Sequence, residues 1–298
     1  LEIGFHETVE FLKRGIELID KNTNDSDGSK LKYRGLKSGY ENYFKKISGQ
    51  INGAENFKLL VTEESNWNNF LKFVEKEASK TEKDYLDALL NLVDEEQKES
   101  LARSYYGNSV LISQAKRLYR NAVEKEKIDS ERKPGYQERD QEGIMNRIKS
   151  LDYSFDLKID KVIFKDRLSV YSKIDSSLRR PIYSELLKLD GNLNKTNQAV
   201  DEIYSSQYRD SKSFLKMMEY SLDELNNSTD PLIMFAKKTY EESLEYEKKY
   251  EAISARRQLL KSKFIGLLKN YYESSNRQLY ADANGTLRVT YGNVAGVS

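Results

Sequence analysis

The chain has 298 residues, of which 33% are charged, and its 49 Lys and Arg against 48 Asp and Glu leave a net charge of +1. This balance lacks the basic excess that attracts a phosphate backbone, so nucleic acid is not an expected partner. The absence of Cys excludes disulfides, thiolate zinc sites and a Cys nucleophile, and no apolar run approaches the ~18 residues of a membrane span.

The N-terminal quarter predicts two helices and sets the fold class as mainly α, because few Pro residues interrupt this highly charged sequence. Apolar residues at helical spacing predict a first helix around residues 7–21, and residues 22–28 have the composition of a loop. The second helix carries an apolar stripe and two pairs of glycines spaced by four. Each Gly costs up to ~1 kcal/mol of helix stability. We therefore expect another backbone to approach this face closely, at Gly35, Gly39, Gly49 and Gly53.

The middle of the chain contains three boundary signals. Thr81 with Asp84 has the Thr-x-x-acid pattern of a helix start. Pro134-Gly135 marks a turn in a charged stretch, so a sub-domain boundary is expected near residues 130–140. Residues 151–164 alternate apolar and polar in places, which permits a strand, but their helical neighbours favour a helix.

The C-terminal part changes from helical to strand-like sequence. Asp230 followed by Pro231 is a strong helix start, and the helix is expected to run to about Tyr272. Residues 286–291 alternate and are β-branched and aromatic, which indicates a strand with no obvious partner in this chain. We expect an elongated multi-helix bundle over residues 1–274, then a linker and a β segment over 275–298 that belongs to a domain absent from the chain.

Residues for common catalytic chemistry are scarce. His6 is the only histidine, and no G-x-S-x-G turn accompanies it. The run from His6 to Glu10 begins like H-E-x-x-H, but Glu10 stands where the second metal-binding His is needed. There is also no phosphate-binding Gly-rich loop. We expect no catalytic residue, metal ligand or cofactor in this chain.

Two sequence blocks suggest a family. The first is LKYRGLKSGYENYFKKISGQ at residues 31–50, and the second is DANGTLRVTYGNVAG at residues 282–296. Their order resembles the bacterial dipeptidyl peptidase 7 and 11 family of serine peptidases, family forty-six in the chymotrypsin-like clan. These enzymes carry a large helical domain inserted between segments of a double β-barrel. The positions of the second block that fit this motif include Asp282, Asn284, Arg288, Tyr291 and Gly292; those of the first include Lys32, Tyr33, Asn42, Tyr43, Lys45 and Gly49.

The resemblance implies that this chain is a helical cap over the cleft of a serine dipeptidyl aminopeptidase. The triad His and Asp would lie upstream and the Ser downstream, so the segment alone would be inactive. Asn42 matches the Asn that helps to hold the free amino terminus of the peptide substrate, with Tyr43, Phe44 and Lys45 as a candidate cleft wall. The resemblance also implies an oligopeptide substrate, the β-barrel of the same polypeptide as partner, a homodimeric parent, and a periplasmic or cell-surface location.

Departures from the family pattern affect the amine site. Phe44 replaces the usual Trp, Lys37 stands where Tyr is common, and Ala281 replaces Pro. Lys37 would repel an ammonium unless it points away. Two alternatives stay open at this point: Asn42 is an ordinary helical Asn, and the chain is a helical scaffold or peptide-binding protein without a peptidase.

Overall fold

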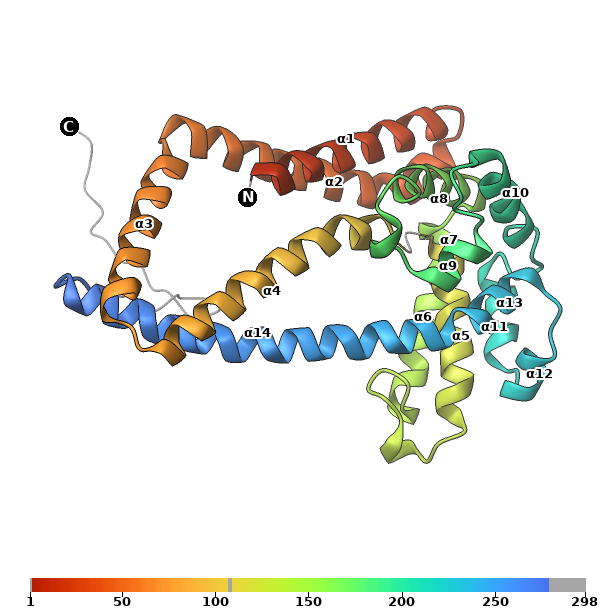
Figure 1. Cartoon of the computed structure of the whole chain (residues 1–298). Helices are drawn as coiled ribbons and strands as arrows, with labels where there is room; N and C mark the ends of the chain where they lie inside the picture. The colour runs from red at the N-terminus through yellow and green to blue at the C-terminus, as the bar shows by residue number, and fades with distance from the viewer. Residues whose placement is uncertain (1, 107–108, 279–298) are drawn as a thin grey trace, which may run out of the picture.

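A computed structural model describes residues 2–106 and 109–278 of the chain (Figure 1). Every regular element within these residues is a helix, which confirms the mainly α class. The strand expected at residues 286–291 lies outside the described residues. The helices form two regions: a frame of long helices, made of α1–α4 and α14, and a compact body of short helices, α5–α13, over residues 109–239 (Figure 1).

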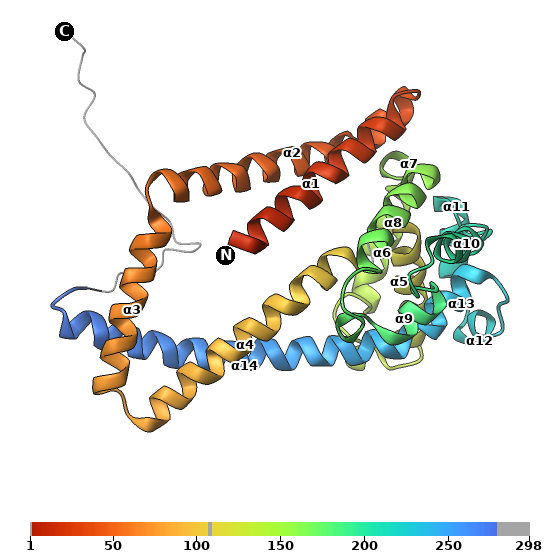
Figure 2. The ribbon, with the colours of Figure 1, turned by 45° about the horizontal axis from the view of Figure 1, so that its top comes forward.

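The frame begins with two helices that pack side by side, α1 (Glu2–Thr23) and α2 (Asp27–Asn56), as Figures 1 and 2 show. The loop predicted over residues 22–28 is too long. Helix α1 continues through Thr23, and α2 begins at Asp27 because the Ser26 hydroxyl accepts a hydrogen bond from the Ser29 amide at 3.2 Å.

The expected close approach at the α2 glycines is wrong. A Cβ added at Gly35, Gly39, Gly49 or Gly53 would meet no described atom within 4 Å, so the described residues leave this face of α2 open. The close approach occurs instead at Gly15 of α1, where an added Cβ would lie 2.6 Å from the Tyr40 ring. Gly15 therefore lets α1 and α2 approach.

The rest of the frame consists of α3 (Leu59–Glu77), α4 (Lys80–Tyr105) and α14 (Tyr240–Ser274). Helix α3 connects the end of α2 to the far end of α14, and α4 leads back to the body (Figures 1 and 2). The start of α4 differs from the prediction: Ser79 and Glu82, rather than Thr81 and Asp84, form the capping box. The three helices meet in a small apolar cluster of Phe70, Val74, Leu86 and Leu267.

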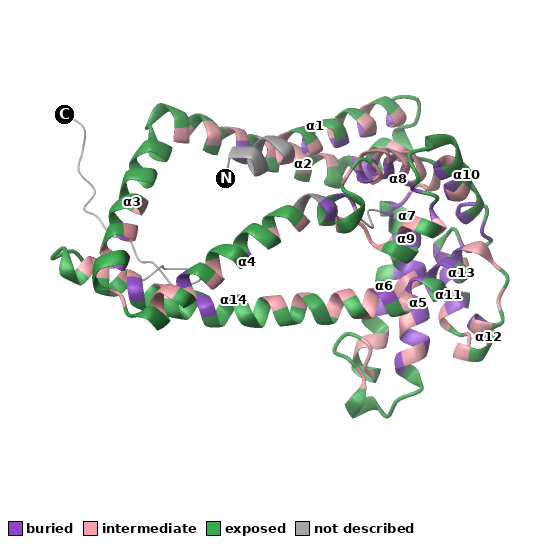
Figure 3. Ribbon diagram, in the orientation of Figure 1, coloured by how far each residue is buried: buried purple, intermediate pink, exposed green. Residues whose placement is uncertain are grey.

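The compact body packs nine short α-helices around one large core. These are α5 (Val110–Lys125), α6 (Gln141–Lys149), α7 (Leu151–Ser154), α8 (Leu157–Tyr171), α9 (Pro181–Leu186), α10 (Leu193–Ile203), α11 (Ser211–Met218), α12 (Leu222–Asn226) and α13 (Pro231–Lys238), with 3-10 turns at Asp129–Glu131, Glu138–Asp140 and Ser176–Leu178. Residues 151–164 contain no strand, as favoured, but they form two helices that are interrupted at Phe155 and Asp156, and the Asp156 side chain caps α8. Figure 3 shows buried residues concentrated in this body.

The single long helix expected from Asp230 to about Tyr272 is two helices. Asp230 does cap α13, accepting hydrogen bonds from the amides of Leu232 and Ile233. Helix α13 ends at Lys238, next to the buried Thr239, whose hydroxyl donates to the Phe235 carbonyl at 2.8 Å, a contact that often bends helices. Helix α14 then starts at Tyr240.

The first turn of α14 is fixed to the body by a buried carboxylate. Glu242 is 3% exposed, and its two oxygens accept hydrogen bonds from the amides of Ile182 at 2.7 Å and Tyr183 at 3.3 Å. These amides belong to the first turn of α9, which has no capping side chain of its own. The long helix therefore leaves the body at a defined point.

Candidate functional site

Helix α2 carries the predicted site residues, and it has two different faces. Tyr33 and Ile47 are buried, and Tyr40 is half-buried between them at a spacing of seven residues. Asn42 follows Tyr33 by nine residues, which is two and a half turns at ~3.6 residues per turn. Asn42 therefore lies on the opposite face of α2, where it is exposed.

The first part of the family block anchors α2 to the body. The Lys32 ammonium donates to the Phe155 carbonyl at 2.8 Å, and the Tyr33 hydroxyl donates to the Asp156 carbonyl at 3.3 Å. The Ser29 hydroxyl donates to the Asp156 carboxylate at 2.8 Å. Burial raises the pKa of Tyr33 above its ordinary value, so the phenol keeps the proton that it donates. The Lys-Tyr pair thus fixes the helix that presents Asn42.

Lys37, the departure expected to disturb an ammonium site, is directed elsewhere. Its Nζ lies 2.5 Å from the Asp20 carboxylate of α1 and 3.7 Å from Glu41. The hydrogen bond with Asp20 raises the pKa of Lys37. Because Lys37 and Asn42 are five residues apart, they project about 140° apart around the helix. The charge of Lys37 is compensated on the side that faces α1.

The candidate cleft wall is divided between the two faces of α2. Tyr43 is 46% exposed, and the Lys46 ammonium lies 5.9 Å from the centre of its ring. Lys45 is exposed as well. Phe44 is half-buried and, eleven residues after Tyr33, lies on the side of the buried stripe. Asn42, Tyr43 and Lys45 are therefore the ones open to a ligand.

Several predicted positions lie beyond what the structure describes. The positions of the second family block, Asp282, Asn284, Arg288, Tyr291 and Gly292, lie outside the described residues. His6 falls in the first turns of α1, and its side chain is not among those described. Within residues 2–106 and 109–278, no group of three or more metal-binding side chains comes together, and no helix is long and apolar enough to cross a membrane.

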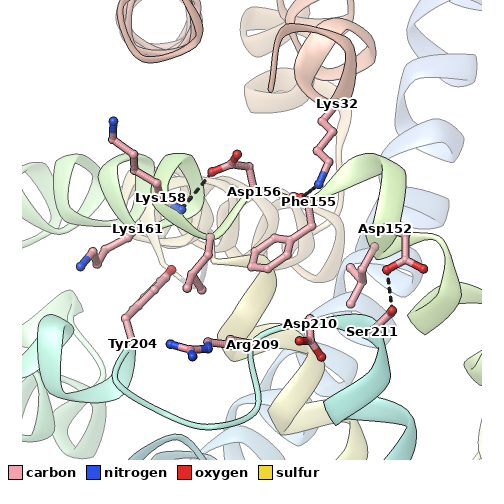
Figure 4. A pocket seen from close by; sticks show the side chains of 12 residues that line it. Lys32, Asp152, Phe155, Asp156, Lys158, Lys161, Tyr204, Arg209, Asp210 and Ser211 are labelled. Carbon is pink, nitrogen blue, oxygen red and sulfur yellow. Dashed lines mark hydrogen bonds between the residues drawn. The ribbon is translucent and has the colours of Figure 1, made fainter. Parts of the chain in front are cut away.

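A cavity of about 550 Å³ was not predicted from the sequence (Figure 4). It lies where the junction of α7 and α8 faces the end of α10 and the start of α11, and Lys32 of α2 reaches its edge. Its residues come from three stretches that are tens of residues apart, so no local motif brings them together. Its lining contains both cations and carboxylates, with the Phe155 ring between them (Figure 4).

A buried carboxylate beside this cavity holds the body together. Asp160 of α8 is 3% exposed and accepts hydrogen bonds from the Tyr204 hydroxyl at 2.6 Å and the Val110 amide at 2.8 Å. The Leu111 amide and the Ser109 hydroxyl also donate to it. Burial raises the pKa of Asp160, while these hydrogen bonds oppose the rise. Since every donor comes from this chain, Asp160 joins α8, α5 and α10 and is not a free acid or base.

Comparison of the whole sequence with known proteins finds the same family that the two sequence blocks resembled. The family model described as Peptidase S46 matches residues 1–298. An Asp/Glu-specific dipeptidyl-peptidase of Shewanella putrefaciens is 30% identical over 270 residues, covering 89% of this chain and 36% of that protein. An Asp/Glu-specific dipeptidyl-peptidase of Capnocytophaga gingivalis is 22% identical over 293 residues, covering 95% of this chain and 40% of that protein.

The chain therefore spans only 36 to 40% of the length of these two relatives. The match nevertheless runs through the helices that carry the first block and through the positions of the second. The chain belongs to the Peptidase S46 family, the family that its sequence resembled.

Proposed function

We propose that this chain is the helical cap domain of a serine-type dipeptidyl peptidase. The observation that carries the proposal is the family match over all 298 residues, combined with relatives that are named dipeptidyl-peptidases and extend well beyond the matched region. Every described element is a helix, whereas a chymotrypsin-like catalytic domain is built from strands. The triad would lie outside these residues, in a β-barrel of the same polypeptide.

In this proposal, α2 contributes to recognition of the substrate's amino terminus. A side-chain amide oxygen accepts hydrogen bonds, and an ammonium has three to donate. Asn42 is exposed on a helix whose other end is anchored through Lys32 and Tyr33. An ammonium held at a fixed distance from the reactive serine makes the enzyme cleave after the second residue, so binding energy becomes positional specificity.

The rest of the proposal concerns the parent enzyme. It would release dipeptides from oligopeptides with a free amino terminus through an acyl-enzyme intermediate. Its cap would close the cleft and exclude water. The family resemblance supports a periplasmic or cell-surface location and a homodimeric parent.

The proposal that the catalytic triad lies outside residues 1–298 is tested by comparing two proteins. A whole enzyme that contains residues 1–298 should release dipeptides from a chromogenic dipeptidyl substrate, and residues 1–298 alone should release none. Circular dichroism of the shorter protein checks that it is folded and helical. Dipeptide release by residues 1–298 alone would contradict the proposal that the triad lies elsewhere.

The amine-binding role is tested by Asn42→Ala in the whole enzyme. A hydrogen bond to a charged group contributes ~1.5–3 kcal/mol, so kcat/KM for a free-amine peptide should fall about 10- to 100-fold. Asn52→Ala is a matched control, because Asn52 is also exposed on α2 but points to a different side. An unchanged kcat/KM in Asn42→Ala would remove Asn42 from the mechanism and leave the cap assignment standing.

A further inference from the structure

The cavity between the α7–α8 junction and α11 has a charge separation across it. Figure 4 shows Arg209 and Lys161 on one side and Asp152 and Asp210 on the other, while the Lys158 ammonium points away from Arg209 and Lys32 lies above Asp152. The ring of Phe155 lies between the two sides (Figure 4). At about 550 Å³ the cavity falls within the ~300–1,000 Å³ typical of small-molecule sites. A ligand that matched it would be positive at one end and negative at the other.

On the acidic side, two carboxylates each keep one oxygen available. Oδ1 of Asp152 accepts a hydrogen bond from the Ser211 hydroxyl at 2.5 Å, and Oδ1 of Asp210 accepts one from the Ser213 amide at 2.7 Å. Within the described chain, Oδ2 of each has no hydrogen-bond partner or ion pair. A third carboxylate, Asp156, is engaged through both oxygens, by the first amides of α8 and by Ser29. Asp152 and Asp210 are therefore the groups that can receive an ammonium.

On the basic side, the cations differ in how far they are already paired. Lys161 forms an ion pair with Asp201 at 3.0 Å. Lys32, which lies on the side of Asp152 in Figure 4, donates to the Phe155 carbonyl at 2.8 Å. Among the described residues, the side chains of Arg209 and Lys158 have no carboxylate within ion-pairing distance. The Arg209 guanidinium can bind a carboxylate through two parallel hydrogen bonds. Arg209 is thus the best placed group to receive a ligand carboxylate.

The surface between the two sides is apolar. Phe155 and Leu151 are each 5% exposed and are packed into the body, so they form a fixed floor. Such a floor accepts a small apolar side chain between the ionic ends. A ligand with only negative charge would be repelled by Asp152 and Asp210, and a purely cationic one by Arg209 and its neighbours.

We propose that this cavity is a second peptide-binding site, which takes a short peptide with both ends free. The ammonium of the peptide lies against Asp152 and Asp210, its carboxylate lies against Arg209, and a side chain covers Phe155. The binding itself does not depend on the proposed function. If that function holds, dipeptides released by the catalytic domain are ligands of this kind, and the site retains product on the cap.

Isothermal titration calorimetry of the 298-residue chain tests the proposal with four probes: alanyl-phenylalanine, its N-acetyl form, its C-terminal amide, and the doubly blocked form. Exposed ion pairs contribute little each, so we expect a dissociation constant on the order of 0.1–1 mM for the free dipeptide. Blocking either end should weaken binding about fivefold or more. No measurable binding of the free dipeptide, or equal binding of all four probes, would overturn the proposal.

Variants assign the two ends. Arg209→Gln should weaken binding of the free dipeptide about fivefold but leave binding of the C-terminal amide unchanged. Asp210→Asn should likewise weaken binding of the free dipeptide but leave binding of the N-acetyl form unchanged. Asn still caps a helix, so Asp210→Asn keeps α11 intact. Lys216→Gln, an exposed change on α11 outside the cavity, is the control and should change nothing. If Arg209→Gln binds the free dipeptide as tightly as Lys216→Gln does, Arg209 does not bind the ligand carboxylate and this assignment is wrong.

The Asn42→Ala variant separates this proposal from the cap function. It should leave dipeptide binding to the 298-residue chain unchanged, because Asn42 does not line the cavity. If Asn42→Ala abolishes the binding, the dipeptide sits on α2 and the second site is refuted. If Asn42→Ala lowers neither activity nor binding, the amine-site proposal fails while the cavity proposal stands.

Discussion

The compact body and the long-helix frame bury their apolar residues in different ways. The body gathers most of the buried residues into one continuous core, as Figure 3 shows. The frame has two small clusters, one where α1 and α2 meet α8 and one where α3, α4 and α14 meet. Because apolar burial provides most of the stabilising free energy, the body should be the stable unit and the frame the adaptable one.

The polar contacts of the body and of the frame also differ. In the body, the buried carboxylate of Asp160 accepts hydrogen bonds from helix amides, and Glu242 at the base of α14 accepts them from the first turn of α9. In the frame, α14 is tied to α4 by more exposed ion pairs, Glu99 with Lys249 and Glu96 with Arg257. Exposed pairs of this type contribute only ~0–1 kcal/mol each. The frame is thus joined by weak, separable contacts.

The strongest test of this contrast compares two buried phenylalanines. Phe164 in the body is 0% exposed and Phe70 in the frame is 2% exposed. Phe164→Ala should cost about 3–5 kcal/mol and destabilise the whole fold, since it leaves a cavity in the continuous core. Phe70→Ala should open α3 and the end of α14 while α5 and α8 stay protected. Hydrogen exchange measured by mass spectrometry distinguishes these patterns, and loss of protection in α5 for Phe70→Ala would break the distinction.

A smaller effect, specific to the body, concerns the pH dependence of Asp160. Because burial raises its folded-state pKa above the unfolded value of about 4, the native state holds this proton more tightly. The contribution of this protonation to the free energy of unfolding is fully present below about pH 4 and is lost as pH rises toward the folded-state pKa of Asp160. The difference in unfolding free energy between the wild type and Asp160→Asn should therefore decline over this range. A difference that increases with pH in urea titrations would show that the hydrogen bonds outweigh burial.

The smallest expected effects compare two glycines of the frame. Gly15→Ala would place a methyl group 2.6 Å from the Tyr40 ring and should cost about 1–3 kcal/mol by separating α1 from α2. Gly35→Ala meets nothing and should stabilise α2 by about 0.5–1 kcal/mol. Thermal unfolding followed by circular dichroism measures both. If Gly35→Ala destabilises the 298-residue chain, its face of α2 is covered in solution.

Local signals in the sequence predicted the helical class, the cap at Asp230-Pro231 and the helical character of residues 151–164 apart from the interruption at Phe155 and Asp156. They failed where contacts far apart in the chain decide the outcome. The glycines of α2 look like a packing face by spacing alone, but among the glycines that the structure describes, it is Gly15 of α1 that has a ring against it. The helical pattern of the sequence also continues through Thr239, where the structure has a break between α13 and α14.

In the candidate site, too, local sequence signals predicted some features, and contacts between distant residues decided the others. A motif placed Asn42 on a helix, and the structure shows it exposed, whereas the orientation of Lys37 depends on Asp20 of another helix and could not be derived from spacing. The charged cavity required α11 to fold against the α7–α8 junction. No periodicity connects Asp152 with Arg209, so the cavity could only be found in three dimensions.

Because α14 is attached to the body through Glu242 at its first turn, a small change of its tilt there would be amplified along its length. Its 35 residues extend over roughly 52 Å, at ~1.5 Å per residue. A tilt of only about 5° at its base would carry the far end, and the α3 corner packed on it, through about 4–5 Å. A small repacking around α9 would therefore displace the opposite end of the frame by about the length of one amino acid.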